Sequence, residues 1–173
     1  DESDSTETTD DSARTDAADT NATNRTQPRR SVAHLRETSN EQYERAQNAS
    51  AQGEFYTAAS LCFGSNLLRE EITLRGSDRE SRQTVLANTK RNAQNVREVI
   101  EKTDLRTVGD LEITMIASER LSDVEKELAT MNGANPNVQS LAYASERLET
   151  ARAWLTLLGT PTGPPIALSD DEL

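Results

Sequence analysis

Two seven-residue repeats of apolar side chains, separated by a short turn, constrain the fold of this chain more than any other feature. The first repeat ends just before Asn132-Gly133, and the second begins after Asn135-Pro136. Apolar residues at alternating spacings of three and four fall on one narrow stripe of an α-helix. Because the turn is short, the sequence predicts an antiparallel helical hairpin. The first stripe holds Ala117, Leu121, Val124, Leu128 and Met131, and the second holds Leu141, Ala144, Leu148, Ala151, Leu155 and Leu158.

Helical spacing also runs through the chain from Pro28 onward. We expect helices at about 31–52, 54–75 and 78–103, with glycines between the first two pairs of segments. No alternating run of β-branched residues indicates a strand. The sequence therefore predicts an all-α, five-helix bundle with antiparallel helical hairpins over residues 28–160.

The segment 54–75 is apolar on two sides, which is typical of a helix in the middle of its domain. One side holds Phe55, Ala58, Cys62, Ser65, Leu68 and Ile72, and the other holds Tyr56, Ala59, Phe63, Leu67 and Leu74. The inner faces of its neighbours include Val32, Leu35, Tyr43, Ala46 and Ala49 in the first helix, and Val85, Leu86, Ala93, Val96, Val99 and Ile100 in the third. Helix starts are expected at Ser77 or Asp78, at the capping-box pattern Thr107-Val108-Gly109-Asp110, and at Asn135-Pro136.

The two ends of the chain differ in composition from the helical part. Residues 1–27 hold eight acidic and two basic residues, a net charge of −6, and are rich in Thr. Such a segment buries too little apolar surface to fold, so we expect a disordered acidic linker. Residues 161–173 form a Pro-rich tail that ends with Ser169 and three acidic residues, the pattern of a helix start, and predict a truncated helix.

Acidic residues outnumber basic ones, and lysine is scarce. The net charge is −11, and only Lys90, Lys102 and Lys126 are lysines among 19 basic residues. Surface carboxylates repel one another unless salt screens them, so this balance favours a halophilic archaeal origin over an ordinary acidic mesophilic domain. It also argues against nucleic acid as a partner. No apolar run reaches the length of a membrane span.

The side chains needed for catalysis are few. His34 is the only histidine, and although Arg29 and His34 match the Arg-x4-His pattern of HEPN ribonucleases, their place beside the linker favours a surface histidine. The single Cys62 lies on an apolar stripe and predicts a packed, structural thiol. The acidic pairs 70–71 and 125/127 are interpreted as solvated helix faces. We therefore expect no catalytic, cofactor-binding or metal-binding residue in this segment, although the parent protein could still be an enzyme.

Two kinds of surface residue are candidates for function. Asn21 and Asn24 lie in glycosylation sequons within the acidic linker, and Asn48 begins a third sequon. Trp154, with Tyr143, is a candidate partner contact because aromatic residues dominate interface energetics, although core packing is the commoner role. The expected partner is a protein.

The stretch from Gly53 to Gly64, with a Gly-x-aromatic-aromatic-x-Ala pattern after the small residue Ala46, joins two helices by a tight turn. This stretch resembles the helical region that follows the peptidase domain in archaeal Lon-like serine proteases. The resemblance implies a non-catalytic helical accessory domain of an exported haloarchaeal peptidase, with an extracytoplasmic or cell-surface location and its own peptidase domain or another chain as partner. Alternatives are a stand-alone tetratricopeptide-like or HEPN-like interaction module, or a surface structural protein.

Overall fold

The computed structural model describes residues 30–160, which form five α-helices without a strand in that range. The helices are α1 (Val32–Ala51), α2 (Phe55–Gly76), α3 (Arg79–Lys102), α4 (Val108–Thr130) and α5 (Val138–Leu155). The predicted all-α fold with five helices is confirmed. The expected linker at 1–27 and the tail at 161–173 lie outside the described residues.

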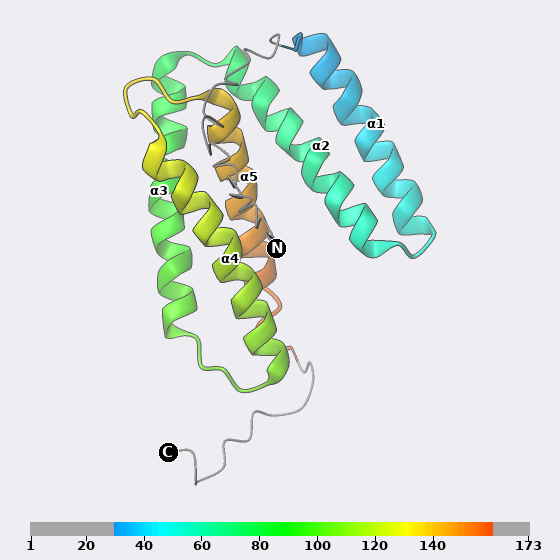
Figure 1. Cartoon of the computed structure of the whole chain (residues 1–173), viewed down its shortest axis with the longest axis vertical. Helices are drawn as coiled ribbons and strands as arrows, with labels where there is room; N and C mark the ends of the chain where they lie inside the picture. The colour runs from blue at the N-terminus through cyan, green and yellow to red at the C-terminus, as the bar shows by residue number, and fades with distance from the viewer. Residues whose placement is uncertain (1–29, 161–173) are drawn as a thin grey trace, which may run out of the picture.

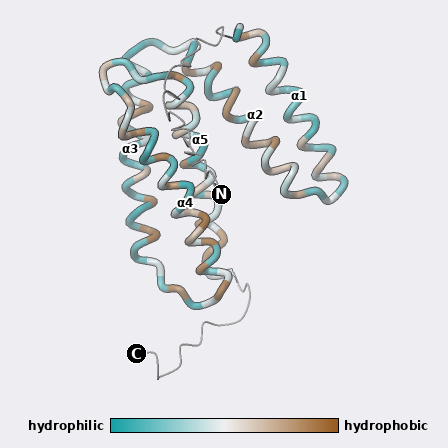
Figure 2. Tube along the Cα trace, in the orientation of Figure 1, coloured by the Kyte–Doolittle hydropathy of each residue, from teal (hydrophilic) through white to brown (hydrophobic). Residues whose placement is uncertain are grey.

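The helices are arranged as a three-helix bundle and a projecting hairpin (Figure 1). Helices α3, α4 and α5 pack side by side, while α1 and α2 form an antiparallel pair that diverges from the bundle. Helix α2 connects the two parts, because it packs against α1 on one side and against α5 on the other. The predicted packing of α2 on two sides is therefore confirmed, but the central helix is α5, which packs against α2, α3 and α4. Figure 2 shows that α1 is mostly hydrophilic along the trace, whereas α2 carries more hydrophobic residues.

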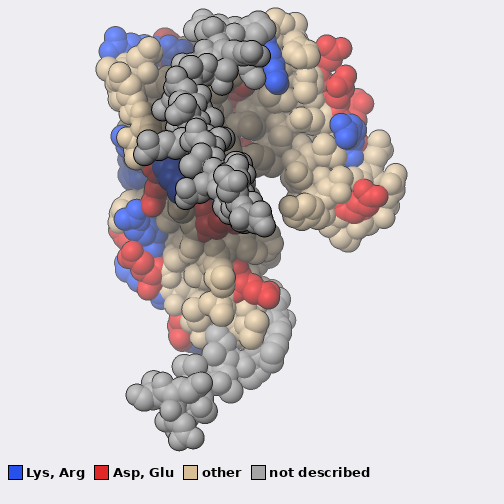
Figure 3. Space-filling view, in the orientation of Figure 1, with Lys and Arg blue, Asp and Glu red and all other residues tan. Residues whose placement is uncertain are grey.

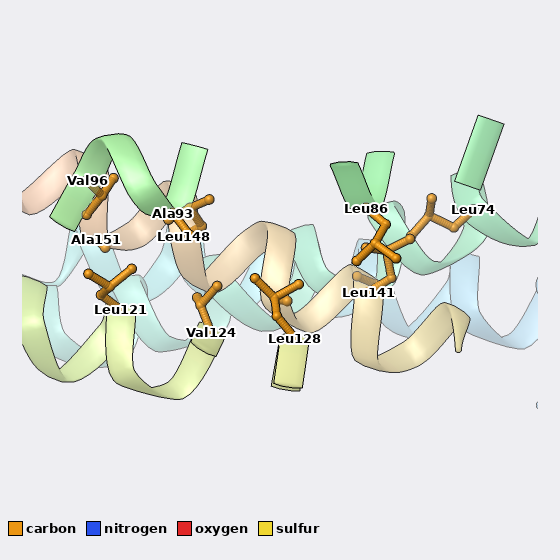
Figure 4. Packing of buried hydrophobic residues seen from close by; sticks show 12 residues of the cluster. Leu74, Leu86, Ala93, Val96, Leu121, Val124, Leu128, Leu141, Leu148 and Ala151 are labelled. Atoms are coloured by element: carbon orange, nitrogen blue, oxygen red, sulfur yellow. The ribbon is translucent and has the colours of Figure 1, made fainter. Parts of the chain in front are cut away.

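The main core lies between α3, α4, α5 and the C-terminal end of α2. Leucines of α4 and α5 face each other across the seam, and small residues of α5 leave room for them (Figure 4). Leu155 packs against this cluster and is partly buried. The predicted hairpin seam is thereby confirmed. The buried cluster comprises Leu74, Leu86, Ala93, Val96, Leu121, Val124, Leu128, Leu141, Ala142, Ala144, Leu148 and Ala151.

Side-chain caps fix where the helices begin. The Asp78 carboxylate accepts a hydrogen bond from the Ser81 N–H at 2.7 Å, and Thr107 and Asp110 form the predicted reciprocal capping box. Asp110 also accepts from the Gly159 N–H at 3.0 Å, which ties the end of α5 to the start of α4. The Gly159 bond, followed by the Thr107 hydroxyl, lowers the pKa of Asp110.

Three details of the sequence prediction are wrong. The N-cap of α5 is Asn137 rather than Asn135, because its side chain accepts from the N–H groups of both Gln139 and Ser140. Helix α5 ends at Leu155, and a tight turn carries the chain to Gly159, where φ is 75°. Six residues expected on inner faces or apolar stripes are exposed instead, because neighbouring helices leave much of their sides open to solvent: Val32, Tyr43, Phe55, Tyr56, Ala59 and Val99.

Candidate protein-interaction surface

The α1–α2 hairpin, called the arm below, is held together by small and polar residues. The Ser39 hydroxyl donates to the Ser65 carbonyl at 3.0 Å, and the Ser65 hydroxyl donates to the Ser39 carbonyl at 2.9 Å. Both serines are fully buried. Alanines of both helices are buried between this pair and the tip of the arm, at Ala46, Ala49 and Ala58. Small side chains allow the helix backbones to approach closely, as the sequence predicts, and make the arm a tightly packed unit.

The tip of the arm presents two aromatic rings to solvent. Gly53 has a φ of 80°, a conformation that favours glycine, and it turns the chain sharply between the helices. Phe55 and Tyr56, in the first turn of α2, are 72% and 90% exposed. Exposed aromatic rings are costly to leave in water and are enriched at protein interfaces. The tip is therefore a candidate contact surface.

Farther along α2, the arm is joined to α5 by aromatic and polar contacts. The rings of Phe63 and Tyr143 meet edge to face with centroids 6.2 Å apart, and the Arg147 guanidinium lies 5.9 Å from the Phe63 ring centre. The Asn66 amide donates to the Glu146 carboxylate at 3.1 Å. These contacts mark the point from which α2 and α5 diverge.

Beyond this point, α2 and α5 diverge (Figure 1). Tyr56 lies two helical turns before Phe63 on the same face of α2, and Trp154 lies two turns after Arg147 on the corresponding face of α5. Figure 3 shows the end of the arm standing clear of the bundle. We call this region the aromatic notch and define it by Tyr56, Ala59 and Phe63 of α2 with Arg147, Thr150 and Trp154 of α5. Trp154, the predicted partner contact, is half-buried in it.

Two carboxylates lie where the notch closes. Burial raises the pKa of Glu70 on α2 and that of Glu146 on α5, and the charge of Glu70 adds to the effect on Glu146. The hydrogen bond from Asn66 opposes the shift at Glu146. Neither carboxylate forms an ion pair with a residue in the range 30–160. The closed end of the notch is thus acidic.

Arg147, by contrast, is already neutralised. Its guanidinium pairs with Asp123 of α4 at 2.7 Å and lies 3.7 Å from Glu119. It therefore joins three helices, since it also covers the Phe63 ring on α2. This pairing leaves the notch with an excess of negative charge.

The residues considered for catalysis are dispersed. His34 is exposed in the first turn of α1, and Cys62 is half-buried on α2, rather than fully packed as the sequence predicts. Glu71 is buried, contrary to the solvated face that the sequence predicts for residues 70–71, and it pairs with Arg75 at 2.5 Å. Glu125 pairs with Arg97 of α3. Within residues 30–160, no three His, Cys, Asp or Glu side chains are grouped so that they could hold a metal ion.

The remaining predicted sites fall on different parts of the chain. Asn21 and Asn24 lie outside the described residues. Asn48 is exposed near the end of α1. The sequence predicts Phe55 and Tyr56 on apolar stripes of α2, whereas both rings are exposed. The signal against burial is their position directly after the Gly53 turn, where α1 has already ended and offers no surface to cover them.

A second group of exposed apolar residues lies where α4 begins, beside the end of α5. Val108, Leu111 and Met115 follow one another on one face of α4, and Met115 is 63% exposed. Leu105 and Leu157 lie on the adjoining segments. The apolar residues of this surface are aliphatic, without the aromatic rings of the notch.

Comparison with known proteins gives the chain no relative: no protein-family model, curated protein or solved structure matches it. Among the described helices, none combines the length and apolar character that crossing a membrane requires.

Proposed function

We propose that this chain is a non-catalytic helical interaction module that holds a partner protein in the aromatic notch. The observation that carries the proposal is the exposure of Phe55 and Tyr56 at the end of a tightly packed arm. In a chain with six aromatic residues, two rings exposed side by side at a tip favour a contact role. Trp154 on the opposite wall supports the same role.

The parent that we propose is an exported haloarchaeal Lon-like serine peptidase, whose peptidase domain is then the nearest candidate partner. The support is the resemblance of residues 53–64 and the acidic, lysine-poor composition. Reading the gene upstream of Asp1 tests this parentage. A Ser-Lys peptidase domain encoded there supports it, whereas a start codon close to Asp1 contradicts it and favours a stand-alone tetratricopeptide-like or HEPN-like module or a surface structural protein.

Site-specific photocrosslinking in the native host tests the interaction itself. A benzophenone amino acid at position 56 lies in the notch, and the same group at position 43 lies on α1 outside the notch, where Tyr43 is partly exposed and contacts Arg69 of α2. We expect a discrete protein adduct from position 56 and none from position 43. Equal adducts from both positions, or none from position 56, contradict the proposal.

A further inference from the structure

Each wall of the notch is one face of an α-helix. Its lining residues recur at alternating spacings of three and four, which span two helical turns. From Tyr56 to Phe63 the open wall of α2 rises about 10 Å. A third helix between the two walls can pack its side-chain ridges into the grooves of each wall, as helices ordinarily pack. The lining is apolar except for Arg147 and Thr150.

The negative charge at the closed end of the notch favours a cationic helix over an acidic one. Glu70 and Glu146 face each other across the α2–α5 contact, and both are half-buried. Glu149 lies one turn farther along α5 and adds its charge to the same edge, although Arg152 pairs with it at 2.9 Å. Two half-buried carboxylates that lack a cation gain most from a Lys or Arg brought by a partner.

We propose that the aromatic notch binds a cationic amphipathic helix of a partner protein, with the apolar side of that helix between α2 and α5 and its Lys or Arg residues against Glu70 and Glu146. This proposal rests on the interaction role proposed above and adds the chemistry of the partner. Tyr56 and Trp154 also suit a cationic helix, because aromatic faces attract Lys and Arg side chains. An acidic helix would meet the uncompensated carboxylates and be repelled.

Binding of synthetic helices to the chain tests this proposal. The probe is a fluorescent 18-residue Leu/Lys amphipathic peptide, and its counterpart has Glu in place of each Lys. Anisotropy is measured at the lowest KCl concentration at which circular dichroism shows a folded chain, because salt screens the charges. We expect the Lys peptide to bind and the Glu peptide not to bind. Equal binding of the two peptides overturns the proposal.

Matched variants separate binding in the notch from attraction to an acidic protein in general. Glu70→Gln/Glu146→Gln removes two charges and keeps the side-chain shapes, and Glu37→Gln/Glu41→Gln removes two charges from the exposed side of α1. We expect the first pair to raise the Kd about tenfold and the second to leave it nearly unchanged. Tyr56→Ser should weaken binding as well, whereas Met115→Ser, on α4 outside the notch, should not. Similar effects of the two charge pairs contradict a site in the notch.

The crosslinking result at position 56 distinguishes failure of the cationic-helix proposal from failure of the interaction role. If position 56 crosslinks to a protein segment without Lys or Arg, the interaction role holds and the cationic partner is wrong. If adducts are absent, both fail. Identification of the crosslinked peptide by mass spectrometry distinguishes these results.

Discussion

At the residue scale, the contact between Ser39 and Ser65 decides how closely the arm packs. Ser39→Ala removes one buried hydrogen bond and should lower the free energy of unfolding by about 1 kcal/mol. Ser39→Leu also introduces a large side chain where the backbones are close, and overpacking of this kind costs about 1–3 kcal/mol. Urea unfolding measures both effects. Ser50→Ala, at an exposed position of α1, is the control and should change stability by less than about 0.5 kcal/mol.

The carboxylates of the notch give stability a pH dependence of known sign. Burial raises the pKa of Glu70 and Glu146 in the folded chain above the reference value of 4.5, so the folded state binds their protons more tightly than the unfolded state. Their contribution is therefore favourable below about pH 4.5 and is lost as the pH rises through the folded values. At pH 7 Glu70→Gln/Glu146→Gln should be more stable than the parent chain.

The same comparison at pH 4 is the control. There the parent carboxyls are largely protonated and resemble the amides, so the difference in the free energy of unfolding should shrink. A difference that stays constant from pH 4 to pH 7 would show that burial does not penalise the charges. Asp78 and Asp110, whose pKa values are lowered in the fold, are present in both chains and do not affect the comparison.

At the scale of elements, the α4–α5 seam carries the core. Leu148 is 1% exposed among leucines of both helices, and its truncation to Ala should cost about 2–5 kcal/mol. Leu157→Ala, in the exposed turn after α5, removes the same atoms outside the core and serves as the matched control. Thermal or urea unfolding of the two variants gives the comparison. A loss below about 0.5 kcal/mol for Leu148→Ala contradicts the seam.

The helices and their main seam could be predicted from the sequence, whereas the angle between α2 and α5 could not. Heptad spacing and caps such as Thr107 predict the five helices and the α4–α5 seam, because these depend on neighbours in the chain. The exposure of Tyr56 depends instead on the angle at which α2 leaves α5, and periodicity does not encode that angle. The proximity of Glu70 to Glu146 likewise depends on contact between segments distant in the chain. The acidic end of the notch therefore could not be derived from the sequence.

At the scale of the whole molecule, charge sets the conditions under which the fold is stable. The chain carries a net charge of −11, and its core is built largely from Ala, Val and Leu. We expect the melting temperature to rise steeply between 0.1 and 3 M KCl, as the Debye length falls from about 10 Å to below 3 Å. Circular dichroism follows the transition. An unchanged melting temperature across this range contradicts a halophilic origin.

Helix α2 runs unbroken from the tip of the arm into the core, so it connects the two directly. The edge-to-face contact of Phe63 with Tyr143 divides the helix into two segments. The outer segment ends in the exposed first turn, and the inner segment reaches Leu74 in the core of the bundle. The outer segment from Phe55 to Phe63 is about 12 Å long, and the inner segment to Leu74 is about 16 Å long. A partner that displaced the tip would therefore act on the packing around Leu74 through one continuous helix, eleven residues beyond Phe63.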